Sequence, residues 1–239
     1  MGFGVSEQTY GRGQVEWALW RSFVRTRIGA REMPTAFRTR VKRLLDVDRD
    51  LDIGDVEVAP GVDYAFVRPP DADGAEASYS AVDAFCLAIG LDLLDTGFKQ
   101  SEVVFLLRYL RPDFEDRFPT MLREPSLIDR QRHLSKHHPN LPAYEENGVR
   151  FADNRMFVIV QKIEMTEVLP PATKDKVKGP LFLEPVFCSG IGKLGECLHE
   201  AMPNHRRIVT VLELAATAQA VSAFLEKAPQ IRRGRPKAK

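Results

Sequence analysis

Residues 10–49 read YGRGQVEWALWRSFVRTRIGAREMPTAFRTRVKRLLDVDR, and this stretch decides the fold that we expect. Its first half, 14–27, places apolar side chains at the i, i+3, i+4 and i+7 spacing of a helix that packs against a core. A second helix is predicted from Pro34 and Thr35 onward, because proline suits a first helical position and threonine can cap. The apolar side of that helix consists of Phe37, Val41, Leu44 and Leu45. The sequence therefore predicts a pair of amphipathic helices joined by a turn.

The outer faces of this helix pair are rich in arginine. Between residues 12 and 43 there are nine Arg or Lys and two acids, although the formal net charge of the whole chain is +1. Positive charge sorted in this way is typical of a DNA-binding surface, because neutralised phosphates release counterions. A solvated arginine-rich surface without a nucleic-acid partner is the alternative. The residues expected to contact DNA here are Arg12, Arg21, Arg25, Arg27, Arg38, Thr39, Arg40, Lys42 and Arg43.

The composition is that of a globular protein. The chain has 239 residues, 44% hydrophobic and 28% charged, which suffices for one large domain or two small ones. No run approaches the roughly 18 apolar residues of a membrane span, and the first residues lack a signal-peptide pattern. We therefore expect a cytoplasmic protein. The cysteines Cys86, Cys188 and Cys197 have unrelated spacings and are expected to be reduced core thiols.

An acidic segment follows the basic one and contains two predicted strands, 56–58 and 64–67, which would form a wing behind the helix pair. A third helix is predicted after Ser80, which with Asp83 has the spacing of a capping box, and Gly97 ends it. A fourth helix begins near residue 100 and is expected to stop at Pro112.

The order of these pieces resembles the winged helix-turn-helix of MerR-type regulators. The resemblance covers residues 10–110 and rests on the opening Tyr10-Gly11, the step Tyr79-Ser80 with Asp83, and the turn Gly97-Phe98. In that family the opening begins the first helix, the tyrosine-serine-aspartate step leaves the wing, and the glycine-phenylalanine turn joins the last two helices of the domain. The resemblance implies that the second helix is the recognition helix.

Residues 113–143 are expected to be a linker with a short helix. Its His133 and His137 have a spacing that can bind metal, but no carboxylate follows at a helpful offset and Pro139 breaks the helix, so no metal is expected. No nucleophile with a base, paired-carboxylate cleft or phosphate loop occurs at a recognisable spacing. The glycines at 190, 192 and 195 indicate a turn before a short helix rather than a dinucleotide-binding loop. We therefore expect neither an enzyme nor a cofactor.

Residues 144–229 are predicted to form a small α/β domain of order β-β-α-β-α. The predicted strands are 156–163, 181–187 and 207–214, and the last helix is 215–227. Dimerisation, ligand sensing and contact with another protein are the open roles for this domain. Homodimerisation is preferred, because DNA readers commonly double their contacts by two-fold symmetry.

The tail, 230–239, is the most specific local signal in the chain. Its core Arg233-Gly234-Arg235-Pro236, flanked by Arg232 and Lys237, resembles an AT-hook, a motif whose Arg-Gly-Arg core lies in the minor groove of A·T-rich DNA. Glycine has no side chain to collide with the groove, proline holds an extended path, and narrow grooves attract arginine. A disordered basic terminus is the alternative.

Together these features predict an α+β protein with a mainly helical winged helix-turn-helix (1–112), the linker (113–143), the small α/β domain (144–229) and a disordered basic tail (230–239). The function expected is that of a bacterial, nucleoid-associated, sequence-specific transcriptional regulator that binds double-stranded DNA as a homodimer. The second helix would place Arg38, Thr39, Lys42 and Arg43 at the bases of the major groove, and the tail would occupy the minor groove. RNA polymerase is a further candidate partner. The alternatives are a protein-protein adaptor tethered to DNA by the tail, and a weakly specific architectural DNA-binding protein.

Overall fold

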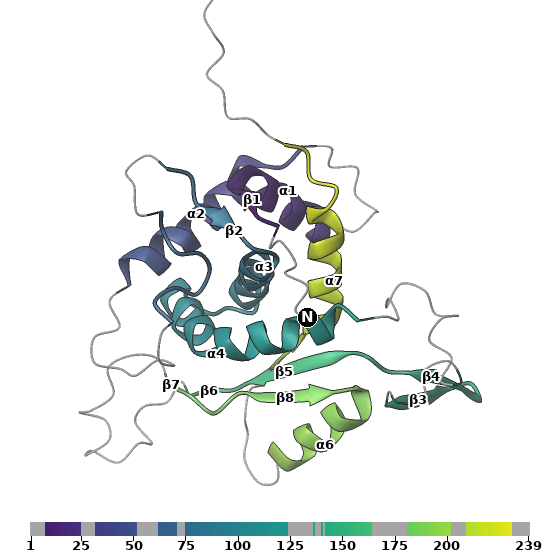
Figure 1. Cartoon of the computed structure of the whole chain (residues 1–239). Coiled ribbons are helices and arrows are strands. Elements are labelled where there is room, and N and C mark those ends of the chain that lie inside the picture. The colour runs from purple at the N-terminus through teal and green to yellow at the C-terminus, as the bar shows by residue number, and fades with distance from the viewer. Residues whose placement is uncertain are drawn as a thin grey trace, which may run out of the picture.

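The computed structural model describes residues 8–24, 32–51, 62–70, 75–123, 136, 140, 142–163, 181–201 and 209–230. Helices are combined there with small antiparallel sheets, so the predicted α+β class is confirmed (Figure 1). The helices are α1 (Arg12–Phe23), α2 (Thr35–Asp50), α3 (Ala81–Asp95), α4 (Gln100–Met121), α6 (Ile191–Ala201) and α7 (Leu214–Leu225). The strands are β1 (Tyr10–Gly11), β2 (Ser78–Tyr79), β3 (Ala143–Glu146), β4 (Val149–Ala152), β5 (Met156–Val160), β6 (Lys162–Ile163), β7 (Leu181–Phe182), β8 (Val186–Ser189) and β9 (Thr210–Glu213).

Helix α3 lies at the centre of the helical part, with α1, α2, α4 and α7 around it (Figure 1). Its residues 83–91 are all buried, as expected for a helix that is apolar on every side. The predicted capping box is present: Ser80 N donates to Asp83 Oδ2 (2.8 Å), and Asp83 N donates to Ser80 Oγ (3.1 Å). Gly97 follows the helix with φ +95°, a left-handed conformation that glycine adopts at low cost. Local sequence therefore fixes both ends of α3.

Helix α4 continues past the proline that was predicted to end it, so that prediction is wrong. A proline inside a helix costs about 3 kcal/mol because it removes a hydrogen bond and crowds the preceding turn. Beyond Pro112, however, Phe114, Phe118 and Met121 are buried. Each contributes about 1.5–3 kcal/mol by leaving water, and together they outweigh the proline. Residues 113–121, expected in the linker, are therefore the last turns of α4.

Strand β5 is the middle strand of a three-stranded antiparallel sheet of order β8-β5-β9. Every residue of β5 is buried, because helices cover both faces of this sheet. Met156, Val158 and Val160 belong to the core that includes α4 and α7, whereas Phe157 and Ile159 pack with residues of α6. Successive side chains thus enter opposite cores, as the two-residue repeat of a strand requires. Figure 1 shows α4 on one side of the sheet and α6 on the other.

Helix α7 shares a core with the N-terminal helices. Its Leu214, Val221 and Leu225 are buried within the cluster that holds α1, α3 and α4. The ring of Phe224 meets Trp17 edge-on at a centroid distance of 6.2 Å, and Gln14 Nε2 donates to the carbonyl of Ala228 (3.5 Å). The segment predicted as a separate C-terminal domain therefore contributes to one continuous hydrophobic core, and the boundary placed at residue 112 falls within α4.

Strands β3 and β4 form a hairpin that projects from the body and was absent from the sequence prediction (Figure 1). Asn147 (φ +53°) and Gly148 (φ +75°) are its two turn residues, and such left-handed pairs match the twist of the flanking strands. The rings of Tyr144 and Phe151 stack across the hairpin at 5.6 Å. The signal was available, because Asn-Gly between strand-like residues is a strong indicator of a hairpin.

The predicted wing is not formed as expected. Residues 64–67 adopt no strand, and the other predicted wing strand, 56–58, lies outside the described residues. Ala65 and Phe66 are fully buried, and their backbone groups bond to side chains of α2 and α4 instead of to another strand. Side-chain partners therefore replace the strand ladder here.

Candidate nucleic-acid interface

Helix α2 is amphipathic, with one apolar face and one polar face. Val41 and Leu44 are buried, as the helical spacing predicts. The opposite face exposes Arg38, Thr39, Lys42 and Arg43. The Thr39 hydroxyl donates to the carbonyl of Thr35 (3.0 Å), one turn earlier. The residues predicted for base recognition therefore do share one exposed side of α2.

Acidic neighbours accompany most of these cations. Arg40 Nη2 lies 2.5 Å from Asp95 Oδ1, and Lys42 pairs with Asp46 one turn later. Arg38 Nε lies 4.0 Å from Glu16 Oε2. Within the described part of the chain, Arg43 makes no ion pair. The count of basic residues in the sequence thus overstates the uncompensated positive charge of this surface.

The strength of these pairs decides whether the surface can still receive phosphate. The Arg38 and Lys42 side chains are 57% and 60% exposed. Exposed ion pairs contribute about 0–1 kcal/mol and are screened by salt. A hydrogen bond from arginine to phosphate is charge-assisted and often bidentate, so it can replace a pair of this kind. The surface is therefore compatible with phosphate contacts.

Helix α1 carries the other described basic residues. Arg12 Nε donates to Glu16 Oε1 (2.8 Å), and the Arg21 guanidinium lies 5.8 Å from the centre of the Trp17 ring. The rings of Trp20 and Phe37 meet at 5.3 Å and hold α1 against α2. The remaining predicted contact residues lie outside the described residues; they are Arg25, Arg27, Arg232, Arg233, Gly234, Arg235, Pro236 and Lys237.

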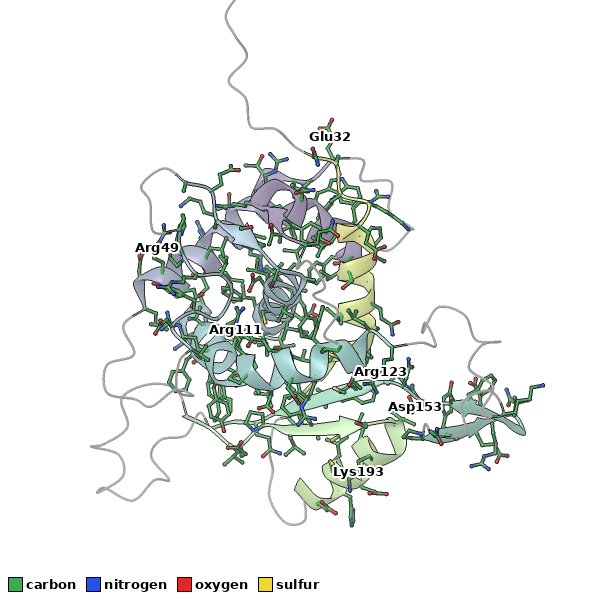
Figure 2. All side chains as sticks on the ribbon, in the orientation of Figure 1. Glu32, Arg49, Arg111, Arg123, Asp153 and Lys193 are labelled. Atoms are coloured by element: carbon green, nitrogen blue, oxygen red, sulfur yellow. The ribbon has the colours of Figure 1, made fainter. Side chains whose placement is uncertain are left out.

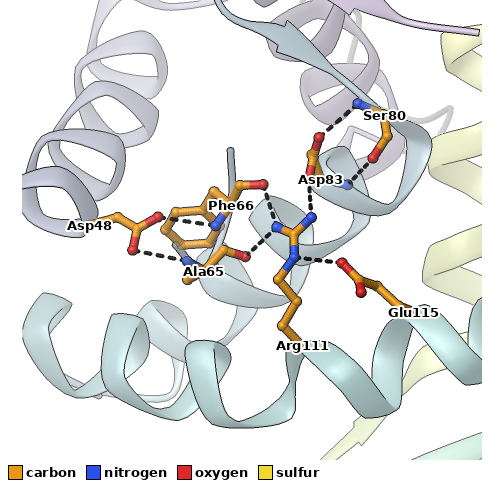
Figure 3. A network of polar contacts seen from close by, with 7 residues as sticks. All are labelled: Asp48, Ala65, Phe66, Ser80, Asp83, Arg111 and Glu115. Carbon is orange, nitrogen blue, oxygen red and sulfur yellow. Dashed lines mark hydrogen bonds and ion pairs between the residues drawn. The ribbon is translucent and has the colours of Figure 1, made fainter. Parts of the chain in front are cut away.

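A buried polar cluster behind α2 was missed by the sequence reasoning. We call Asp48, Arg108 and Arg111 the clamp residues, because Asp48 and Arg111 hold the backbone of Ala65 and Phe66 (Figure 3) and Arg108 pairs with Asp48. Asp48 accepts from both backbone N–H groups at 3.0 Å, and Arg111 Nη1 donates to both carbonyl oxygens, at 3.1 and 2.6 Å. Figure 2 shows Arg111 inside the helical part, whereas Arg49 lies at its outer edge.

The clamp residues left a readable signal in the sequence. Asp48 follows Val41 and Leu44 at the spacing of the buried face, and Arg108 interrupts the apolar run of α4. A charged residue on a buried face requires a buried partner. Arg108 Nε lies 3.0 Å from Asp48 Oδ1, and the side chains are 8% and 2% exposed. Asp48 and Arg108, the two charged residues on otherwise apolar faces, are thus each other's buried partner.

Other kinds of site find little support in the described residues. No group of three or more His, Cys, Asp or Glu able to hold a metal ion occurs among them. His133 and His137 lie outside the described residues. The three cysteines are free and buried, as predicted, and burial raises the pKa of the Cys86 thiol to about 12. None of the described helices has the length and apolar character needed to cross a membrane.

Comparison of the chain with protein families, with curated proteins and with solved structures finds no match.

Proposed function

We propose that this protein is a sequence-specific DNA-binding transcriptional regulator, with α1 and α2 as a helix-turn-helix. In this proposal α2 enters the major groove and presents Arg38, Thr39, Lys42 and Arg43 to base edges. Arg12, Arg21, Arg25, Arg27 and Arg40 hold phosphates. A homodimer, and association with the nucleoid and RNA polymerase, belong to the same proposal.

The observation that carries the proposal is that the residues just before the basic tail pack against α1. Gln14 of α1 contacts the carbonyl of Ala228, just before the AT-hook-like tail, and Trp17 contacts Phe224. The tail therefore leaves the folded part beside α1. From Gln230, nine residues extend at most about 30 Å, at roughly 3.3 Å per residue. That reach suffices for the tail to enter a minor groove next to the DNA that α1 and α2 contact.

The first experiment measures binding to DNA duplexes at several salt concentrations. Arg38→Ala is expected to reduce the preference for a selected site, whereas Arg25→Ala weakens binding to all sequences and flattens the salt dependence. Arg150→Ala is the matched control, because Arg150 is an exposed arginine on the projecting hairpin. No binding of the wild-type protein to any duplex at low salt would refute the proposal.

A second candidate function is that of an adaptor that binds other proteins and is tethered to DNA by its tail. The pairing of Arg40 with Asp95 and of Lys42 with Asp46 favours it, because these acids reduce the free positive charge of α2. Deletion of residues 230–239 separates the candidates. An adaptor loses nearly all DNA affinity, whereas a regulator keeps its preferred site. A weakly specific architectural protein, the third alternative, gives no preferred footprint on genomic fragments.

A further inference from the structure

The C-terminal end of α2 is held by a side chain from another helix. The last carbonyls of a helix have no partner within it and need one elsewhere. Arg108 of α4 supplies donors to two of them: Nη1 bonds to the Leu51 carbonyl (3.2 Å), and Nη2 bonds to the Asp48 carbonyl. Its Nε also donates to Asp48 Oδ1 (3.0 Å). One guanidinium therefore caps α2 and ties it to α4.

The same acid joins a third element to this contact. The Asp48 carboxylate, besides pairing with Arg108, accepts the backbone N–H groups of Ala65 and Phe66. Arg111, one turn after Arg108 on α4, takes the carbonyls of those two residues. Helix α2, the segment around Ala65 and helix α4 are thus connected by one buried set of directional bonds.

These buried hydrogen bonds and ion pairs fix the orientation of α2 more than they add to the stability of the fold. Removing charges from water costs nearly as much as their mutual attraction returns, so buried ion pairs add little net stability. Apolar contacts tolerate sliding, whereas a planar guanidinium accepts partners only along fixed directions. The bonds of Arg108 therefore restrict the tilt and rotation of α2 at its C-terminal end, in addition to the packing of Val41 and Leu44.

We propose that Arg108 is a positioning residue for DNA recognition, which fixes the angle at which α2 presents its exposed face; this inference rests on the proposed function. Arg108 is 7% exposed and cannot itself reach phosphate. Arg38 lies ten residues before Asp48, about 15 Å along the helix axis. A tilt of about 10° at the held end moves Arg38 by about 2.6 Å, nearly the length of a hydrogen bond. That shift breaks a bidentate contact to a base.

The test compares two variants of arginines on α4. Arg108→Lys keeps the charge but cannot reach all three acceptors, and Arg117→Lys is the control, because Arg117 pairs with Asp113 and lies over Phe187. Each full-length protein is titrated with a duplex site selected by the wild-type protein and with a scrambled duplex of equal length. Arg108→Lys is expected to lose site affinity by about tenfold, the worth of one bidentate base contact, with scrambled-duplex affinity unchanged. The control leaves both affinities unchanged.

Hydrogen exchange measured on the same samples separates positioning from general destabilisation. Peptides covering 41–51 are expected to exchange faster in Arg108→Lys, whereas peptides covering 81–95 keep their wild-type rate. Faster exchange throughout the protein, or equal losses for both duplexes, overturns the positioning role. Duplex binding by the wild type with an unchanged site preference in Arg108→Lys overturns that role alone. Absence of all duplex binding by the wild type overturns the proposed function and the positioning role with it.

Discussion

Replacing Leu214 with alanine tests whether the two ends of the chain fold as one unit. Leu214 begins α7 and is 0% exposed, in the core shared with α1, α3 and α4. Truncating a buried leucine to alanine costs about 2–5 kcal/mol, through lost burial and the cavity left behind. That is a large share of the roughly 5–15 kcal/mol by which a native protein is stable. The urea midpoint should therefore fall by about 1–2 M.

The assay follows urea unfolding by tryptophan fluorescence and by circular dichroism. Both tryptophans of the chain, Trp17 and Trp20, lie in α1, far along the sequence from the substitution. Because α7 packs against α1, both signals are expected to shift together in Leu214→Ala. Ala223→Ser, an exposed change on the same helix, should alter the unfolding free energy by less than about 0.5 kcal/mol. A fluorescence midpoint that stays at the wild-type value while the dichroism midpoint falls would show that the helices unfold independently.

Three further predictions concern single sites. Asp83→Ala removes one partner of Arg111 and half of the α3 capping box, and should lower the free energy of unfolding by about 2–4 kcal/mol. Glu115→Ala, which removes a half-exposed partner of the same arginine, should cost less than about 1 kcal/mol in the same urea titration. Gly148→Ala places a side chain at φ +75° and should destabilise the hairpin by about 1–2 kcal/mol, as measured by amide hydrogen exchange. Gly192→Ala is the control, because a side chain there enters open space and should leave the exchange of the hairpin unchanged. Equal effects of the two substitutions would contradict the turn geometry. Burial raises the pKa of Asp92 from 3.8 to about 6, so the folded state holds a proton that the unfolded state has released. Stability should therefore fall as pH rises from about 4 to 6, and Asp92→Asn should lack this fall; identical pH profiles would refute the assignment.

Elements that depend on neighbouring residues were predictable from the sequence. The capping box of Ser80 and Asp83 marked the start of α3, and Gly190 was expected to form a turn before a short helix. Gly190 indeed has φ +82° and α6 begins at Ile191, but Gly192 and Gly195, which were assigned to the same turn, lie inside the helix. After residue 156 the predicted order β-β-α-β-α is right only coarsely, because the predicted strand 156–163 is divided into β5 and β6 and the predicted strand 181–187 overlaps both β7 and β8. Short apolar runs between turn residues are local signals of strands, but they do not mark where a strand is interrupted.

Features that depend on distant partners were not predictable in the same way. Proline is a strong local signal to stop a helix, but the burial of Phe114 and Phe118 against distant residues overrode it at Pro112. Residues 64–67 have the composition of a strand, and only the arrival of Asp48 and Arg111 supplies the bonds that a strand would otherwise provide.

In the candidate interface, too, local features were predictable from the sequence and contacts between distant residues were not. Helical periodicity placed Arg38, Lys42 and Arg43 on the exposed side of α2. It could not place Asp95 beside Arg40, because these residues come from different helices. Counting charges along the chain therefore overstated the positive surface, and the DNA-binding role stays a prediction.

The packing of α7 against α1 also affects how the chain folds during its synthesis. Gln14 and Ala228 touch although 214 positions separate them, so α1 leaves the ribosome long before its packing partner exists. Until then the apolar side of α1, with Val15 and Leu19, has no cover from α7. Nascent chains in that condition are prone to aggregate and are typical clients of chaperones. The amount of folded protein obtained from cells should therefore rise when chaperones are supplied in excess, even if the folded protein is itself stable.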